Sequence, residues 1–329
     1  MLSQTTKALL RSSKNLLAFS GGVDSTALLF LLREHNIPFD IAIVDYGLRQ
    51  QSKAEVAYAQ SLAKTYGFNC FVKNAPKITA NFEAKAREIR YDFFEELIAS
   101  RNYDNLLTAH HLGDRLEWML MQFCKGAGTV ELCGMQEREL REGYRLLRPL
   151  LAYDKEELLA YLHKNKIKYF LDASNSDESY KRNSFRKKYA QPLLREYKSG
   201  IKKSFEYLEA DRAALIEPRE ILQKNALACF KKSSTRSNIY YIDKYLKSIG
   251  HIITAKERAL LREHATLIVG RKFVVTQVAD YICIAPFLQN NKLTKEFKEQ
   301  MRLLKVEPKL RGYLATDLEA VAFLSLLLA

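Results

Sequence analysis

Six consecutive residues near the start of the chain have the types and spacing of a phosphate-binding turn: Ser20, Gly21, Gly22, Val23, Asp24 and Ser25. The apolar run at 15–19 predicts a buried parallel strand before the turn, and the run at 27–32 predicts a helix after it. The two glycines allow a sharp turn and a close approach of the backbone to a ligand. Ser25 and Thr26 add hydroxyls beside free N–H groups at the positive end of the helix dipole. We therefore expect a phosphate site built from main chain.

The turn differs from a P-loop because it has no lysine and contains Asp24 instead. The sequence G-x-x-x-x-G-K-[ST] does not occur in the chain. A carboxylate beside phosphates is expected where Mg²⁺ bridges the two. The alternative interpretation is an ordinary Gly-Gly turn with Asp24 as a helix cap. We predict Asp24 as a catalytic residue and as a ligand of Mg²⁺.

A second group of reactive side chains follows the apolar run at 105–110. His110, Asp114 and Glu117 are spaced four and three residues apart, which places them on one face of a helix. An imidazole and two carboxylates could hold Mg²⁺ or orient a nucleophile, and we predict Asp114 as the second metal ligand. The alternative is helix capping by Asp114 and an ordinary solvated Glu117.

Two arginines, Arg87 and Arg90, lie one turn apart on a predicted helix at 81–100, with Asn81 as its expected cap. One of them could neutralise the phosphates of a ligand at the turn or the charge that develops on a departing phosphate group. We predict Arg87 as a nucleotide-binding residue and Arg90 as a catalytic residue. A surface pair with a glutamate is the alternative for at least one of them.

The net charge of +14 favours a polyanionic partner. Residues 181–203 contain nine Lys or Arg residues against one acidic residue, with aromatic residues interleaved. A solvated helix face is the alternative interpretation of this segment. Contact with a nucleic-acid backbone is the better interpretation, because the same chain has a predicted phosphate site.

The strands and helices predicted in the first half of the chain alternate, and these elements must position the side chains described above. Strands are predicted at 15–19, 39–45, 69–73, 105–110 and 144–150, and helices at 52–66, 81–100, 114–124 and 155–166. This rhythm predicts an α/β fold with a doubly wound parallel sheet, whose ligands bind at the carboxyl ends of the strands. Ser20, Asp45 and His110 all fall at such ends, and we predict Asp45 as a nucleotide-binding residue.

The second half has a different pattern. Residues 125–128 are expected to form a flexible turn, and the polar, basic stretch at 172–188 a loop in the absence of a partner. Helical signals follow at 199–228, 239–249 and 256–264, and strand signals at 267–278 and 281–285. We therefore predict a domain boundary that separates 1–198 from a smaller, mainly helical domain at 199–329.

Targeting signals and cysteine usage suggest a cytoplasmic protein. The first twenty residues lack the apolar core of a signal peptide, and the apolar run at 320–328 is too short to span a membrane. The five cysteines contain no C-x-x-C pair, so a disulfide framework or structural zinc is not expected. The oligomeric state is left open, with a homodimer as one option.

The hexapeptide at 20–25 resembles the S-G-G-x-D-S signature of the N-type ATP pyrophosphatases, or PP-loop ATPases. Further motifs narrow the resemblance to the tRNA(Ile)-lysidine synthetase family. These are Val44-Asp45-Tyr46-Gly47-Leu48-Arg49, Ala86-Arg87-x-x-Arg90-Tyr91, His110-His111-x-x-Asp114-x-x-Glu117, and Asp172-x-Ser174-Asn175 followed by Arg182-Asn183-x-x-Arg186. The turn at 125–128 resembles the family's R-G-x-G. The resemblance covers about residues 15–190.

The chain departs from the family pattern at four positions. Tyr46 stands where the family usually has His, Gly113 and Arg115 where Asp and Gln are common, and Trp118 where Thr is common. These changes affect secondary contacts but leave His110, Asp114 and Glu117 in place.

The resemblance implies an adenine nucleotide alpha hydrolase-like fold and a two-step ligation that uses ATP and Mg²⁺. The wobble cytidine of a tRNA(Ile) with a CAU anticodon is adenylated, pyrophosphate leaves, and the ε-amine of L-lysine then attacks the base. Asp24 and Asp114 would manage the metal and the phosphates, while His110 and Glu117 would position lysine or the base. The C-terminal domain would be a reduced tRNA-binding appendage. The residues expected to contact tRNA are Lys181, Arg182, Asn183, Arg186, Lys187 and Lys188.

Three other functions compete with this interpretation. A tRNA thiolase of the same superfamily usually needs a catalytic cysteine pair or a cluster-binding C-x-x-C, and Cys124 and Cys133 do not have that spacing. A glutamine-dependent amidating synthetase would need a glutaminase half. An RNA-binding protein without catalysis would not need the intact turn together with His110, Asp114 and Glu117.

Overall fold

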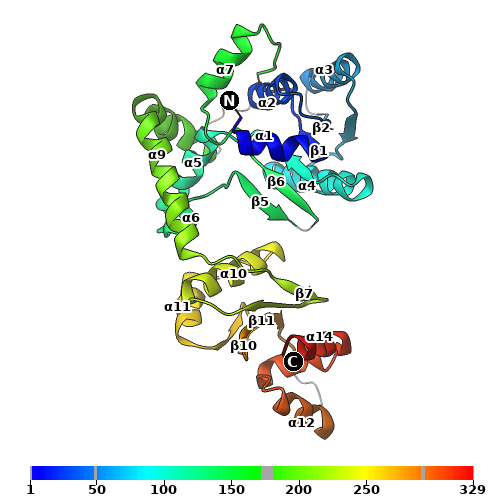
Figure 1. Cartoon of the computed structure of the whole chain (residues 1–329), viewed down its shortest axis with the longest axis vertical. Coiled ribbons are helices and arrows are strands. Elements are labelled where there is room, and N and C mark those ends of the chain that lie inside the picture. Colours follow the sequence, from blue (N-terminus) through cyan, green and yellow to red (C-terminus); the bar gives the residue numbers. More distant parts are fainter. Residues whose placement is uncertain (1, 48–49, 142, 172–180, 290–292, 329) are drawn as a thin grey trace. The chain divides into compact units, whose positions relative to one another are not determined.

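The computed structural model describes residues 2–47, 50–141, 143–171, 181–289 and 293–328. The chain forms two compact units, Met1–Glu209 and Ala210–Ala329 (Figure 1). The division falls inside helix α9 (Gln191–Leu215), which also contains the boundary expected from the sequence. A helix that continues through a boundary leaves no break in composition to mark it.

A six-stranded sheet of order β3-β2-β1-β4-β6-β5 forms the centre of the first unit. Its strands are β1 (Asn15–Ala18), β2 (Asp40–Asp45), β3 (Cys70–Asn74), β4 (Asn105–Leu107), β5 (Arg138–Arg141) and β6 (Tyr144–Leu147). All neighbouring strands pair in parallel except β5, which pairs antiparallel with β6 at the edge. The predicted parallel sheet is confirmed. The edge strand β5 was not predicted, because its sequence, Arg-Glu-Leu-Arg, is charged and has no apolar run.

Helices cover both faces of this sheet, as a doubly wound fold requires. The helices of the unit are α1 (Gln4–Arg11), α2 (Val23–Glu34), α3 (Gln50–Tyr66), α4 (Phe82–Arg101), α5 (Leu112–Phe123), α6 (Thr129–Leu132), α7 (Lys155–Lys164), α8 (Lys181–Phe185), the π-helix η2 (Arg186–Ala190) and α9. Successive residues of β1 point to opposite faces. Leu17 joins the core formed with α2 and α7, and Leu16 joins the core formed with α4.

Three predicted elements need correction. The strand predicted at 105–110 ends at Leu107, so the histidines lie between the strand and α5. The predicted loop at 172–188 is wrong for 181–188, which is helical; the remainder, 172–180, lies outside the described residues. The predicted helix at 199–228 ends at Leu215. Pro218 has no N–H to continue a helix, and Asn225, with φ of 51°, turns the chain between two strands.

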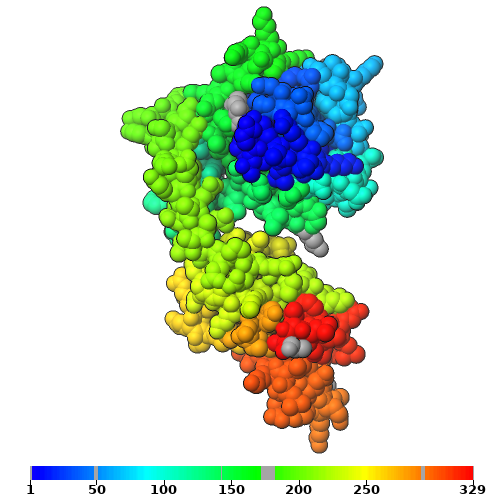
Figure 2. Space-filling model, viewed as in Figure 1, coloured from blue at the N-terminus to red at the C-terminus, as the bar shows by residue number. Residues whose placement is uncertain are grey.

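The second unit combines helices with an antiparallel sheet of order β7-β8-β11-β10-β9. Its strands are β7 (Leu222–Lys224), β8 (Leu227–Lys231), β9 (Thr266–Val269), β10 (Phe273–Val278) and β11 (Tyr281–Pro286), and its helices are α10 (Thr235–Ser248), α11 (Ala255–Glu263), α12 (Lys295–Leu303), α13 (Pro308–Leu314) and α14 (Leu318–Leu328). The C-terminal helix α14 packs into a core with β8, β10 and β11. In the space-filling view its red atoms lie beside the orange atoms of the preceding helices (Figure 2). No helix in the described ranges is both long and apolar enough to cross a membrane.

Candidate active site

The turn at 20–25 connects the carboxyl end of β1 to the amino end of α2. Gly21 has φ of 74°, a backbone conformation that would be strained in a residue with a side chain. Its carbonyl oxygen accepts a hydrogen bond of 2.9 Å from Phe170 N. Gly22 is the N-cap of α2 and makes no side-chain capping bond. Val23 is buried in the core beneath the turn. Among the described residues, the first N–H groups of α2 therefore have no side-chain acceptor, as an anion-binding helix end requires.

The serines of the turn brace the backbone. Ser25 Oγ accepts a hydrogen bond from Ser20 N at 3.2 Å, lies 3.0 Å from Ser20 Oγ, and donates to Gly22 O at 3.3 Å. Both hydroxyls are thus used inside the turn. Ser20 Oγ also accepts a hydrogen bond of 3.4 Å from Gly22 N, so the donors that the turn itself can offer to a phosphate are the N–H groups at the start of α2.

Asp24 lies in the first turn of α2 and is not the cap, because Gly22 occupies that position. Its Oδ1 is 3.9 Å from His111 Nε2, and its Oδ2 is 3.8 Å from Lys155 Nζ. Asp24 Oδ1 is buried and has no hydrogen-bond partner within the part of the chain that the structure describes. A buried carboxylate oxygen without a donor is costly, so this atom suits a cation.

His111, to which the sequence analysis assigns no role of its own, lies between the turn and the second cluster. It caps α5, and its Nδ1 accepts a hydrogen bond of 3.0 Å from Gly113 N. The proton of the neutral ring must therefore be on Nε2. That atom faces Asp24 at 3.9 Å and Asp114 Oδ2 at 3.7 Å. The imidazole lies between the two carboxylates that were predicted as metal ligands.

His110 is held differently from its neighbour. Its Nδ1 lies 2.9 Å from Thr108 Oγ1. Burial lowers the pKa of His110 to about 4; nearby Asp114 opposes this shift, while Arg148, Arg182 and Arg87 reinforce it. His110 is therefore neutral near pH 7 and serves as a hydrogen-bonding group more readily than as a proton acceptor.

Asp114 combines a capping role with a charged cluster. Its Oδ2 accepts a hydrogen bond of 3.0 Å from His111 N, which completes a capping box, and its Oδ1 is 2.6 Å from Arg182 Nη2. Burial raises the pKa of Asp114, but His111, Arg182 and His110 outweigh it and hold the pKa well below its usual range. The carboxylate is ionised at any pH near neutrality.

Glu117 is the most deeply buried carboxylate of the cluster, with a side chain only 1% exposed. Arg182 Nε lies 3.0 Å from its Oε2, and Arg186 Nε lies 2.5 Å from its Oε1. The alternative of a solvated Glu117 is therefore wrong. Two arginines satisfy the buried charge.

The residues predicted to contact tRNA do not all face outward. Arg182 and Arg186 bind Asp114 and Glu117, Asn183 is half-buried, and Lys187 and Lys188 are exposed. The side chain of Lys181 lies outside the described residues, as do Asp172, Ser174 and Asn175 of the same motif. The ion pairs of Arg182 and Arg186 attach the helical residues 181–190 to α5.

Arg87 and Arg90 are both exposed on α4. Arg87 stacks over Tyr91 at 4.7 Å and lies near enough to lower the pKa of His110. Burial raises the pKa of Tyr46, and Arg90 opposes that shift. Neither arginine is paired with a glutamate in the described contacts. The N-cap of α4 is Asn81, as expected, but its side chain makes no capping bond.

Asp45 and Tyr46 shape the loop after β2. Asp45 Oδ1 accepts a hydrogen bond of 2.8 Å from Gly47 N, and Tyr46 donates its hydroxyl to Ala86 O at 3.0 Å. Tyr46 thereby links this loop to α4, a structural contact at the position where the resemblance would place a histidine.

Arg115 and Trp118, the other departures, also have structural contacts. Arg115 is buried and binds Glu209 at 2.7 Å and Cys133 O at 3.3 Å. Trp118 is 44% exposed and lies against Gly134, where a Cβ would come within 2.7 Å of its ring. Neither residue displaces the carboxylates of α5.

A metal ion would find few protein ligands here. Within the described ranges, no group of three or more His, Cys, Asp or Glu residues could hold one. Mg²⁺ commonly uses one or two carboxylates together with substrate phosphates and water. Asp24 fits this pattern through its unpartnered Oδ1, whereas Asp114 is already engaged by His111 and two arginines.

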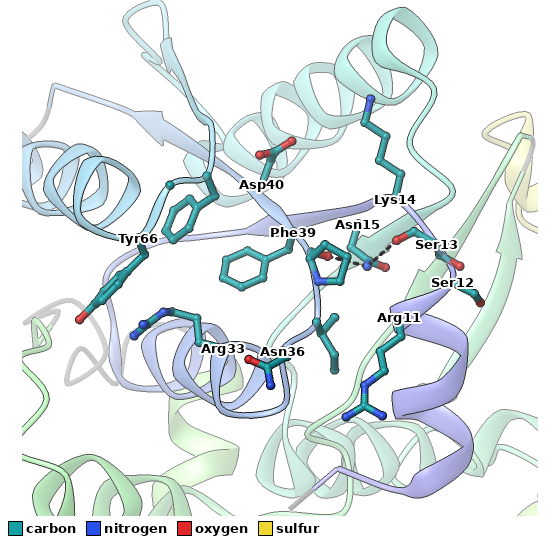
Figure 3. A pocket seen from close by; sticks show the side chains of 14 residues that line it. Arg11, Ser12, Ser13, Lys14, Asn15, Arg33, Asn36, Phe39, Asp40 and Tyr66 are labelled. Atoms are coloured by element: carbon teal, nitrogen blue, oxygen red, sulfur yellow. Dashed lines mark hydrogen bonds between the residues drawn. The ribbon is translucent and has the colours of Figure 1, made fainter.

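A cavity of about 810 Å³ lies away from these residues, at the amino ends of β1 and β2 (Figure 3). Its cations are engaged by the protein. Arg11 donates to His35 O at 3.0 Å, Lys14 donates to Arg101 O at 2.7 Å, and Arg33 stacks on Tyr66 at 3.2 Å. Ligands of doubly wound folds bind at the opposite edge of the sheet, where the turn lies.

The fold and the turn define a PP-loop ATP-binding protein, and residues 2–193 match the PP-loop domain family. Relatives agree over nearly the whole chain. The tRNA(Ile)-lysidine synthase of Helicobacter pylori is 42% identical over 94% of this chain and 91% of its own, and that of Campylobacter jejuni is 40% identical over 96% and 98%. The chain belongs to the tRNA(Ile)-lysidine synthase family.

A solved structure supports the fold alone. The U34-tRNA thiolase of Methanococcus maripaludis superposes with a TM-score of 0.51 at 19% identity, over 63% of this chain and 78% of its own. At this level of identity the similarity concerns the fold and not the activity.

Proposed function

We propose that this protein joins L-lysine to the wobble cytidine of a tRNA(Ile) with a CAU anticodon, using ATP and releasing AMP and pyrophosphate. The product, lysidine, changes the identity of the tRNA from methionine to isoleucine. The observation that carries the proposal is the position of His111 between Asp24 of the phosphate turn and Asp114 of the buried cluster. The phosphate-binding turn therefore lies next to the charged cluster, where a polar substrate could bind.

In the first step, the C2 oxygen of cytidine attacks the α-phosphate of ATP, and the bond to pyrophosphate breaks. In the second step, the uncharged ε-amine of lysine attacks C2, and the bond from C2 to the adenylyl oxygen breaks with loss of AMP. The amine loses a proton during this attack. The protein must therefore stabilise two leaving anions and hold the cytosine outside its stack.

The phosphate side of the site depends on main chain. The N–H groups at the start of α2 would bind the departing pyrophosphate, and Asp24 Oδ1 would hold Mg²⁺. When bound, Mg²⁺ neutralises charge on the phosphates. We assign the metal to Asp24 in preference to Asp114, since three donors already occupy the latter. Arg87 and Arg90 remain proposed contacts to phosphate, and Asp45 to the nucleotide.

The buried cluster would hold lysine. An α-amino acid presents a carboxylate and an ammonium group, and the cluster provides partners for both. Lysine would exchange with the ion pair between Arg182 and Asp114: the partly exposed Arg182 would pair with the carboxylate of lysine, and the Asp114 oxygen that it releases would pair with the ammonium group. Arg186 would stay on Glu117 and hold the cluster together. Neutral His110 would orient the amine or the base through hydrogen bonds. Exposed Lys187 and Lys188 would contact the tRNA backbone.

Five free cysteines are consistent with the proposed cytoplasmic location, where tRNA and ATP are available. Three of them, Cys133, Cys229 and Cys283, are fully buried.

The test is incubation with ATP, labelled lysine and a CAU-anticodon tRNA(Ile) transcript. We expect acid-precipitable label, with one AMP and one pyrophosphate released for each lysine incorporated. Asp24→Ala should abolish AMP release. Binding of tRNA without AMP release would overturn the proposal in favour of a non-catalytic RNA-binding protein. AMP release without incorporated lysine would exclude lysine as the second substrate.

A further inference from the structure

Lys155 brings an ammonium group to the lysine-free phosphate turn from a distant part of the sequence. It is the first residue of α7, and its Nζ lies 3.8 Å from Asp24 Oδ2. This separation exceeds hydrogen-bond distance, so the ammonium protons are not committed to Asp24. The side chain is 38% exposed and can reach a ligand.

The position of Lys155 is electrostatically unfavourable for the helix itself. A cation in the first turn of a helix faces the positive end of the helix dipole. Three acidic residues lie beside Lys155, the N-cap Asp154 before it and Glu156 and Glu157 after it, but each of them has a different partner. Asp154 pairs with Lys198 at 2.5 Å, Glu156 with Arg195 at 3.5 Å, and Glu157 with Lys202 at 3.4 Å, all from α9. The charge of Lys155 is thus directed to the turn.

Packing fixes α7 beside α2. Leu158 and Leu162 are fully buried in the same core as Leu28 and Leu32 of α2. Leu112 N, at the start of α5, donates a hydrogen bond of 2.8 Å to Tyr153 O, two residues before Lys155. The ammonium group is therefore held near the turn by the fold and not by a flexible loop.

We infer that Lys155 binds the β- and γ-phosphates of ATP and retains the pyrophosphate after the α–β bond breaks. It supplies the positive charge that a P-loop supplies from within the loop. Asp24 is its charge partner before the nucleotide arrives. The inference rests on the proposed function for its place in the reaction, but pyrophosphate binding itself can be measured without turnover.

The experiment compares Lys155→Met, which keeps the length of the side chain, with Lys155→Arg, which keeps the charge. Lys164→Met, at the exposed last residue of α7, is the matched control. Calorimetry measures the binding of magnesium pyrophosphate and, separately, of AMP. Melting temperatures establish that each variant is folded.

We expect K155M to weaken pyrophosphate binding at least about tenfold, the scale of one charge-assisted hydrogen bond, and to leave AMP binding unchanged. K155R should retain most of the affinity, and K164M should match the wild type. Unchanged pyrophosphate binding in K155M, or an equal loss of pyrophosphate and AMP binding, would overturn the inference. If the wild type binds pyrophosphate through Lys155 but makes no lysidine, the proposed function fails and this inference survives.

Discussion

Arg186 Nε lies 2.5 Å from Glu117 Oε1, in an ion pair that joins η2 to the helix carrying the carboxylates. Arg182 reaches the same carboxylate at 3.0 Å from the other side. The basic segment predicted to bind tRNA is therefore anchored by its arginines to the cluster predicted to perform chemistry.

Glu117→Gln should destabilise the protein, because two arginines lose their shared buried counter-charge. Removal of one partner from a buried pair typically costs about 3–5 kcal/mol. Arg182 is 37% exposed, and we expect solvent to reduce the loss to roughly 2–3 kcal/mol in urea unfolding. Lys203→Met breaks the exposed Lys203–Glu206 pair and should cost at most about 0.5 kcal/mol. An E117Q variant as stable as this control would contradict a structural role for the pair.

Gly113→Ala should displace His111, because a Cβ at this position would lie 2.7 Å from His111 Cε1 and 3.0 Å from its Nδ1. Overpacking of this kind lowers the free energy of unfolding by about 1–3 kcal/mol. Because the ring of His111 would be displaced, the rate of pyrophosphate release should also fall. Gly200→Ala is the control, since nothing lies within 4 Å of a Cβ there and the residue is inside α9. It should stabilise the protein by about 0.5–1 kcal/mol. Equal activity of G113A and G200A would show that the position of His111 does not matter.

The low pKa of His110, about 4, predicts a loss of stability in acid. The unfolded chain binds a proton at this residue below about pH 6.5, whereas the folded chain does so only below the lowered pKa. Stability should therefore fall as the pH drops between these values, by roughly 1–3 kcal/mol from this residue. His110→Asn should remove that part of the fall between about pH 6.5 and pH 4.5 in urea unfolding. Parallel curves for H110N and the wild type would refute the assigned environment.

Lys187 and Lys188 should contribute to tRNA binding through phosphate contacts. Each phosphate contact adds about 0.7–0.9 to the slope of the logarithm of the binding constant against the logarithm of salt concentration. The double variant K187A/K188A should therefore lower that slope by about 1.5, measured by filter binding over a range of salt concentrations. Lys64→Ala, an exposed position on α3, serves as the control. A slope unchanged from the wild type would place the tRNA elsewhere.

The phosphate turn and the parallel sheet could be predicted because their signals are local in the sequence. The turn occupies six consecutive residues, and each buried strand is a short apolar run. The turn's lysine, Lys155, could not be predicted in this way, because only the packing of α7 on α2 brings it to Asp24. Nothing in the sequence near Lys155 distinguishes it from an ordinary solvated lysine.

The charged cluster illustrates the same limit. The helical spacing predicts the shared face of Asp114 and Glu117 but is wrong for His110, which precedes α5. The partners Arg182 and Arg186 follow nearly seventy positions later. Their basic neighbourhood resembles a nucleic-acid surface, and only the three-dimensional structure separates the inward arginines from the outward lysines. The sequence does not separate the roles of His110 and His111, because these depend on which of the two adjacent histidines caps α5.

A crystal structure with bound ATP and Mg²⁺ tests the central claim most directly. If the turn binds the nucleotide, the β- and γ-phosphates will lie within hydrogen-bond distance of backbone N–H groups at residues 21–25, with Mg²⁺ on Asp24. Nucleotide bound instead in the cavity beside Arg11 and Arg33, with the turn empty, would contradict it.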